Sequence, residues 1–186
     1  MKRLLDLLLS LIALFVFSIP LLLIALAVRV SSPGPIIYWS DRVGRWDQIF
    51  KMPKFRSMRV DTPAVASHLL VNPEKWLTPV GSFLRKSSLD ELPQIWNILK
   101  GEMSFVGPRP ALFNQHDLIE LRREYGVDSL IPGLTGWAQI NGRDDLSIYQ
   151  KVTWDAEYVK RKSLFFDLKI IGLTLIKMLT KEGVSH

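Results

Sequence analysis

Two adjacent carboxylates offer the sharpest chemistry in this sequence. Asp90 and Glu91 stand in the run 87–94, SSLDELPQ, and a helix that begins at Asp90 places Pro93 in its first turn, where a missing backbone donor is tolerated. The Asp90 carboxylate then stays ionised among helix-terminal amides that attract phosphate, as an aspartyl nucleophile for a pyrophosphate requires. Glu91, together with Asp90, is a candidate ligand for Mg²⁺, which takes one or two carboxylates plus phosphate oxygens and water.

A structural interpretation of the same residues competes with this one. Ser88 and Glu91 have the spacing of a capping box, in which each side chain binds the backbone of the other residue. Acidic residues in a first helical turn also suit the helix dipole. Pro93 argues against a cap at Ser88, because it would then occupy a position that needs a backbone donor. Both interpretations stay open at the level of sequence.

Arg109 is the strongest candidate for holding a phosphate group. It lies between Pro108 and Pro110, whose fixed φ angles present the guanidinium from a stiff turn. A guanidinium binds phosphate through two parallel hydrogen bonds. Lys54 and Arg85 add cations in other polar stretches of the chain. The alternative for all three is a charge that faces solvent or lipid headgroups.

The run 132–143, PGLTGWAQINGR, is too polar and too rich in glycine for a plain core element. Its glycines allow close backbone approach, and Gln139 and Arg143 are candidates for contacting a nucleotide, with a structural loop as the alternative. Asp167 lies in an apolar segment, where an acid costs free energy unless it is paired or exposed. It is a candidate for a metal or cation site, or else a helix cap or surface residue. No ligand spacing appears among the histidines, which are His68, His116 and His186.

Composition narrows the class of protein. The chain has 186 residues, enough for one domain with a substantial core, and its lack of cysteine excludes disulfides, thiolate zinc sites and cysteine nucleophiles. The net charge of +6 indicates an anionic partner. Nucleic acid does not fit as that partner, because the basic residues form no stripe with interleaved aromatic side chains.

The amino-terminal segment points to a membrane. No charged residue occurs from Leu7 to Val28, and a helix of that length reaches about 33 Å. Pro20 should kink or break this helix, and Ser18 is placed to serve a carbonyl freed by the break. Basic residues flank both ends, and a re-entrant hairpin with both ends cytoplasmic satisfies both flanks. A straight single-span anchor with a kink and a cleaved signal peptide are the alternatives.

The remaining residues predict an α+β fold that is mostly helical. A short strand at 36–39 and a partner within 48–58 predict a small β-hairpin. Helices are expected over 80–99 with an interruption at 87–93, and then over 112–125, 147–162 and 165–180. The helix at 112–125 is amphipathic, with Arg122 among the charged residues of its wet face. The last helix should pack on the domain or lie in the membrane interface, because its charged residues make a second span costly.

Five features occur in one order along the chain, and together they resemble the bacterial sugar transferase family, the monotopic polyprenyl-phosphate phosphoglycosyl transferases. They are the apolar segment with Pro20, Lys54-Phe55-Arg56, Ser88 to Gln94, Gly107-Pro108-Arg109-Pro110 and Pro132 to Gln139. The resemblance covers essentially the whole chain. At this length the chain is similar to the small form of the family that is only the catalytic core.

The resemblance implies a re-entrant membrane helix at residues 1–30 and a catalytic domain at residues 31–186, with interfacial helices, on the cytoplasmic face of the bacterial inner membrane. The family breaks its helix at a Ser-Pro pair, whereas Ser18 here is displaced by one residue from that position. The implied substrates are a UDP-sugar and undecaprenyl phosphate, with Mg²⁺ as cofactor. A homodimer is compatible with this assignment.

The resemblance also implies roles for single residues. Asp90 would attack the β-phosphate of the UDP-sugar, expel UMP and hold the phosphosugar covalently until the polyprenyl phosphate takes it. Glu91 would bind magnesium and Arg109 would bind phosphate. Lys54, Arg85 and Asp167 match further active-site positions, and Gln139 and Arg143 are weaker candidates for the nucleotide.

A non-catalytic, membrane-anchored scaffold or lipid-binding module is the alternative from another class. It would use the basic charge for anionic headgroups, and it predicts that Asp90 and Arg109 can be replaced without loss of function. A polytopic phosphosugar transferase needs many spans, and the sequence offers one.

Overall fold

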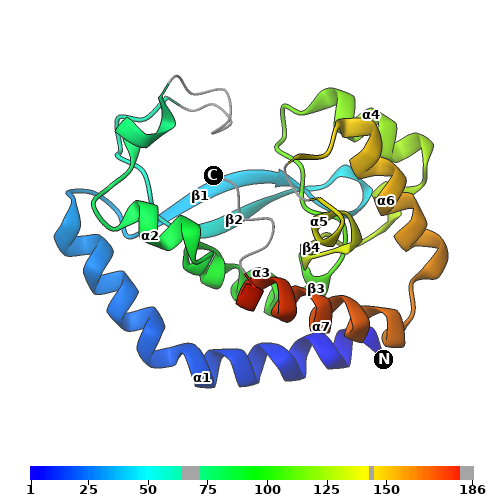
Figure 1. Cartoon of the computed structure of the whole chain (residues 1–186), viewed down its shortest axis with the longest axis horizontal. Coiled ribbons are helices and arrows are strands. Elements are labelled where there is room, and N and C mark those ends of the chain that lie inside the picture. Colours follow the sequence, from blue (N-terminus) through cyan, green and yellow to red (C-terminus); the bar gives the residue numbers. More distant parts are fainter. Residues whose placement is uncertain (64–71, 143–144, 181–186) are drawn as a thin grey trace.

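The computed structural model describes residues 1–63, 72–142 and 145–180, which form the mostly helical α+β fold that the sequence predicts (Figure 1). The α-helices are α1 (Lys2–Ser31), α2 (Gly81–Lys86), α3 (Ile95–Lys100), α4 (His116–Glu124), α5 (Trp137–Ile140), α6 (Ile148–Arg161) and α7 (Leu164–Thr180). The strands are β1 (Ile37–Val43), β2 (Ile49–Phe55), β3 (Ser104–Val106) and β4 (Gly133–Thr135). Short 3₁₀ segments include η1 (Arg45–Asp47), η3 (Pro73–Trp76), η4 (Leu89–Gln94) and η5 (Val127–Ser129).

β1 and β2 form the expected antiparallel hairpin, which is longer than the strand predicted at 36–39. Its register places Tyr38 opposite Lys54. Phe50 and Met52 of β2 are buried against Ile98. Because side chains alternate along a strand, the burial of Phe50 and Met52 fixes which face of the hairpin is turned inward. The hairpin is thereby fixed as a rigid support for Lys54.

The tip of the hairpin has a left-handed backbone at two residues that are not glycine. Trp46 and Asp47 have φ angles of 54° and 58°. Contacts to neighbouring elements hold this conformation: Arg123 of α4 pairs with Asp47, and Arg45 Nε donates to the Ser129 carbonyl at 2.9 Å. The tip is therefore tied to α4 and η5 on one side of the molecule.

β3 and β4 form a second, parallel pair that the sequence did not predict. Its close approach depends on glycine, since a Cβ on Gly133 would lie 2.1 Å from the Gly107 nitrogen. A Cβ on Gly136 would lie equally close to the Gly107 carbonyl oxygen, at 2.1 Å. The glycines of the 132–143 run thus allow the backbone to approach another strand end. This contact places the turn after β3, which carries Arg109.

α1 is a long helix that bends along one edge of the molecule (Figure 1). Pro20 lies inside it and removes the donor that the Val16 carbonyl would otherwise receive. Ser18 does not serve that carbonyl, as its hydroxyl donates to the Phe15 carbonyl at 2.9 Å. α1 is long and apolar enough to cross a membrane, and only 6% of its most apolar window is buried. This exposed apolar surface indicates membrane association.

The first turns of α1 carry polar side chains that bind the folded domain. Lys2 Nζ donates to Asp167 at 2.6 Å and to the Val106 carbonyl at 2.9 Å. The Asp6 carboxylate, 5% exposed, accepts hydrogen bonds from the Ser104 hydroxyl and the Phe105 amide, both at 3.0 Å. The amino end of α1 is therefore fixed on β3 and α7.

The carboxyl end of α1 is fixed on the same domain by Arg56, which follows β2. The Arg56 guanidinium is buried and donates to the Ser32 carbonyl at 2.8 Å and also to the Pro33 carbonyl. Carbonyls at a helix end lack partners within the helix, and a cation there also suits the dipole. Both ends of the apolar helix consequently belong to one folded unit.

α4 and α6 are joined by a buried ion pair, and here the structure corrects the sequence prediction. α4 begins at His116 and not at 112, and Arg122 does not lie on a wet face. Its Nε and Nη2 donate to Asp155 Oδ2 at 3.1 and 2.7 Å, and the Asp155 side chain is 2% exposed. Arg122 Nη1 also donates to the Arg109 carbonyl at 2.9 Å. The pair therefore supports the turn that carries Arg109.

We expect Asp155→Ala to lower the free energy of unfolding by about 3 kcal/mol, because it leaves the Arg122 charge buried without its partner. Glu157→Ala is the matched control on the same helix. It removes a partly exposed pair with Arg161 and should change stability by less than about 0.5 kcal/mol. Denaturant unfolding of both variants measures the difference, and equal effects would contradict a supporting role for the buried pair.

Candidate active site

The two central carboxylates lie in the first turn of η4. Ser88, just before it, has a φ of 56°, and its side chain makes no capping hydrogen bond. The capping-box interpretation of Ser88 and Glu91 is therefore wrong for this structure. The Asp90 residue is 7% exposed, and Pro93 is accommodated inside the 3₁₀ segment. The local backbone thus leaves both carboxylates available for contacts with other elements.

Glu91 joins three elements through one carboxylate oxygen. Its Oε1 accepts a hydrogen bond from Lys54 Nζ of β2 at 2.7 Å and another from Arg109 Nη2 at 2.8 Å. Lys54 Nζ also lies 3.9 Å from Asp90 Oδ2. The structure therefore brings together four of the residues selected from the sequence, and they come from a strand, a 3₁₀ segment and a turn.

The two neighbouring carboxyl groups have pKa values shifted in opposite directions. Burial raises the pKa of Asp90 above its usual value, an effect that the charge of Lys54 only partly offsets. Burial also acts to raise the pKa of Glu91, but the charges and hydrogen bonds of Arg109 and Lys54 outweigh it and hold this pKa well below its usual value. Glu91 is thus firmly ionised, whereas Asp90 is the less stabilised anion. The position of Asp90 in the first turn of η4 therefore does not keep its pKa low, which is contrary to the expectation from the sequence.

Two more cations belong to the site. Arg85 of α2 is close enough for its charge to lower the pKa of Asp90. Arg42 of β1, which no motif of the sequence selected, lies close enough to Arg109 and Glu91 for both charges to act on it. Burial and the charge of Arg109 lower the pKa of Arg42 to about 10. The sequence carried no signal for it, because the strand predicted at 36–39 ends before Arg42 and the observed β1 includes it.

The turn of residues 107–110 is held from several sides. Gly133 N donates to the Pro108 carbonyl and Gly107 N to the Thr135 carbonyl, both at 2.9 Å, and Arg122 binds the Arg109 carbonyl. These backbone contacts leave the Arg109 guanidinium to reach Glu91. The rigid turn predicted from the flanking prolines is thus reinforced by β4.

The other residues selected from the sequence make their contacts elsewhere. Asp167, 3% exposed, pairs with Lys2 and accepts a hydrogen bond from the Tyr158 hydroxyl at 2.6 Å. Gln139 donates to the Leu134 carbonyl at 2.9 Å, and its buried Oε1 has no partner among the described residues. Arg143 lies outside the residues that the structure describes.

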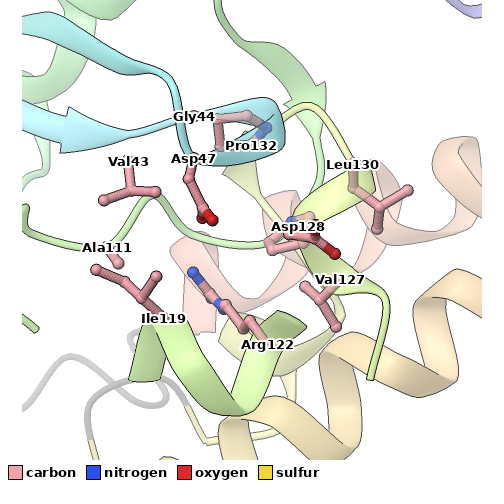
Figure 2. Close-up of a pocket in the computed structure, with 11 residues that line it drawn as sticks. Val43, Gly44, Asp47, Ala111, Ile119, Arg122, Val127, Asp128, Leu130 and Pro132 are labelled. Atoms are coloured by element: carbon pink, nitrogen blue, oxygen red, sulfur yellow. The ribbon is translucent and has the colours of Figure 1, made fainter. Parts of the chain in front are cut away.

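The cavity of Figure 2 is distinct from this cluster. It measures about 30 Å³ and lies between the hairpin tip and α4, where Arg122 extends below the loop that carries Asp47 (Figure 2). A small-molecule site usually needs roughly 300 Å³ or more. This cavity therefore suits a water molecule, and the candidate site remains the charged cluster at Asp90 and Glu91.

The sequence as a whole matches a known family. The chain belongs to the bacterial sugar transferase family, whose model matches residues 1–181, and the resemblance inferred from the five motifs is confirmed. Among its relatives, UDP-glucose:undecaprenyl-phosphate glucose-1-phosphate transferase of Escherichia coli K12 is 43% identical over 185 residues, which are 95% of this chain and 40% of that protein.

Shorter relatives match over most of their length. The uncharacterized sugar transferase EpsL of Bacillus subtilis is 39% identical over 100% of this chain and 91% of its own, and the exopolysaccharide production protein ExoY of Rhizobium meliloti is 40% identical over 98% and 87%. By contrast, the chain spans about two fifths of the length of the first three relatives, at 40%, 39% and 42%.

We expect the neighbouring variants Asp90→Asn and Glu91→Gln to change stability with opposite signs at neutral pH. Asp90 has a raised pKa in the folded state, so its contribution to stability is lost as the pH rises through that pKa, and Asp90→Asn should raise Tm. Glu91 has a lowered pKa, so its contribution is present above its unfolded-state pKa. Glu91→Gln should cost roughly 2 kcal/mol.

Thermal unfolding between pH 3 and pH 8, roughly the range that spans ordinary carboxyl titration, tests both signs. The deficit of Glu91→Gln should shrink as the pH falls, because the unfolded wild type then takes up a proton that the folded carboxylate does not bind. The gain of Asp90→Asn should likewise vanish at acidic pH. A destabilised Asp90→Asn variant at neutral pH would refute the assignment of Asp90 as the strained anion.

Proposed function

We propose that this protein transfers a sugar 1-phosphate from a UDP-sugar to undecaprenyl phosphate and releases UMP, with Asp90 as the nucleophile. The observation that carries the proposal is the cluster itself, in which a buried carboxylate with a raised pKa stands beside a firmly ionised one and is surrounded by Lys54, Arg85 and Arg109. Relatives are named for this reaction, and their names make UDP-glucose the first donor to test.

The reaction divides into two displacements at one phosphorus atom. A carboxylate oxygen of Asp90 forms a bond to the β-phosphorus of the UDP-sugar, and the bond from that phosphorus to the bridging oxygen breaks, so that UMP leaves with the electron pair. An oxygen of undecaprenyl phosphate then attacks the same phosphorus and frees the Asp90 carboxylate. The product is an undecaprenyl diphosphate sugar. No oxidant or water enters either step.

The cations of the cluster are placed to stabilise charge in both steps. Asp90 is desolvated by burial, so it enters the attack less strongly solvated than a surface carboxylate. The Arg109 guanidinium, which contacts Glu91, binds phosphate oxygens of the substrate when the substrate is present. Lys54 lies between the two carboxylates. Fixed cations aimed at developing negative charge supply a large part of the catalysis in such sites.

The carboxylates of the site suit a magnesium ion that would bind together with the nucleotide sugar. Asp90 and Glu91 supply two carboxylates, and Mg²⁺ takes one or two when phosphate oxygens and water complete its coordination shell. Among residues 1–63, 72–142 and 145–180, no group of three or more histidine or acidic side chains is arranged to hold a metal ion. Magnesium bound by these two carboxylates would neutralise charge on the substrate phosphates.

The same proposal includes a re-entrant topology for α1, with both ends and the active site on the cytoplasmic face of the inner membrane. The contacts of Lys2 and Asp6 at one end and of Arg56 at the other support it, because all three attach to one folded domain. A straight crossing would separate these ends by the thickness of the bilayer, about 30 Å. The bend at Pro20 instead returns the chain to the side on which it entered.

Purified protein in lipid nanodiscs should release UMP when given undecaprenyl phosphate, Mg²⁺ and a UDP-sugar, with UDP-glucose tested first. Asp90→Asn should reduce the rate by at least about three orders of magnitude, as loss of a nucleophile does in other covalent enzymes. Asp41→Asn is the matched control, since it makes the same change at a partly exposed carboxylate on β1 that pairs with Lys51.

Without undecaprenyl phosphate, the wild type should release at most one equivalent of UMP, which is the mark of a covalent intermediate. Retained activity in Asp90→Asn would reject the mechanism. Protein that releases no UMP with any donor, and whose cellular function survives replacement of Asp90 and Arg109, would establish the scaffold alternative.

Single cysteines test the topology cleanly, because the chain has no cysteine of its own. Leu4→Cys and Val30→Cys lie at exposed positions near the two ends of α1. A membrane-impermeant maleimide should label both in inverted vesicles and neither in intact spheroplasts. Ile19→Cys, beside Pro20, should resist labelling from either side. Labelling of one end in spheroplasts would show instead that α1 spans the bilayer.

A further inference from the structure

Arg42 and Arg109 present two guanidinium groups to the same part of the cluster. We propose that Arg42 is a second anion-binding residue of the active site, and that with Arg109 it binds the diphosphate of the nucleotide sugar. This inference rests on the proposed function, and it adds a residue that the sequence motifs did not select.

The position of Arg42 follows from two hydrogen bonds. Its Nε donates to the Ser40 hydroxyl at 3.1 Å, two residues earlier on the same face of β1, and its Nη1 donates to the Pro110 carbonyl at 3.3 Å. The second contact ties Arg42 to the turn that carries Arg109. The remaining terminal nitrogen, Nη2, makes no hydrogen bond to any residue that the structure describes.

A purely structural role explains the placement of Arg42 poorly. The turn is already held by Arg122 at the Arg109 carbonyl and by Gly133 at the Pro108 carbonyl. A second arginine at Pro110 brings a half-buried charge near the like charge of Arg109. Burial, and then the charge of Arg109, lower the pKa of Arg42, and the charge of Glu91 only partly offsets them. Repulsion between these two cations costs free energy that Glu91 offsets only in part, and a bound anion would reduce it further.

The charge of the whole cluster points to the kind of anion. Arg42, Lys54, Arg85 and Arg109 face the carboxylates of Asp90 and Glu91. Among the residues that the structure describes, the cations of the cluster outnumber the carboxylates that they face. The diphosphate bridge of a nucleotide sugar carries two negative charges at neutral pH, so it matches this excess, whereas a neutral sugar does not.

Binding of inorganic pyrophosphate to the full chain in nanodiscs, followed by isothermal titration calorimetry, tests this without turnover. We expect Arg42→Gln to weaken binding at least about tenfold, since it removes a charge-assisted contact. Arg42→Lys should recover part of the affinity, because it restores the charge without the planar fork. Raising the salt concentration should narrow the gap between Arg42→Gln and the wild type.

Arg45→Gln is the matched control, because it removes the same charge from the same hairpin at a residue that binds the Ser129 carbonyl outside the cluster. It should bind pyrophosphate within twofold of the wild type, and thermal unfolding should confirm that every variant is folded. Arg42→Gln binding as tightly as Arg45→Gln, or no pyrophosphate binding by the wild type, would overturn the proposal.

The UMP assay separates this inference from the proposed function. A wild type that releases no UMP but loses pyrophosphate affinity on Arg42→Gln would reject the reaction and keep the anion site. A wild type that turns over, beside an Arg42→Gln variant with unchanged KM for the UDP-sugar and unchanged pyrophosphate affinity, would keep the reaction and reject the role of Arg42.

Discussion

The carboxylate of Glu91, held between Lys54 and Arg109, is the contact on which the candidate site depends. It connects β2, η4 and the turn after β3, three segments that are separate in the sequence. In a partly desolvated site the two cations would repel each other without it. By fixing them, Glu91 also fixes the field in which the neighbouring Asp90 titrates, so two adjacent carboxylates acquire different chemistry from one set of partners.

Support for this contact lies outside the cluster. The Arg122 and Asp155 pair holds the Arg109 carbonyl, and the approach of Gly133 to Gly107 leaves room for no side chain. Preorganisation of this kind matters for phosphoryl chemistry, because cations that are already in place need not reorganise as charge develops. The rigid parts of the fold thus serve a site whose own residues lie largely in a short 3₁₀ segment and a turn.

Much of this organisation was predictable from sequence, for local reasons. A short apolar and aromatic run at 36–39 predicted the hairpin, and helical patterns predicted α6 and α7. The order of the motifs indicated the family. Arg122 was misplaced because its burial depends on Asp155, which is far away in sequence and invisible to a pattern of one helix. The glycines of 132–143 predicted a close backbone approach. In the structure, Gly133 and Gly136 approach the backbone of Gly107 at the end of β3, a partner that the local sequence does not reveal. The left-handed backbone at Ser88, which removes the capping box, has no sequence signature in a serine.

The fixed ends of α1 also set an order of assembly. Lys2 and Asp6 find their partners in Asp167 and Ser104, which follow them by 165 and 98 residues. Contacts of such long range form late, because the intervening chain must first be ordered. During synthesis the apolar helix therefore exists before the partners of its amino end have been made. A membrane surface is available to the exposed apolar side chains in that interval, and the folded domain then binds the amino end of the helix.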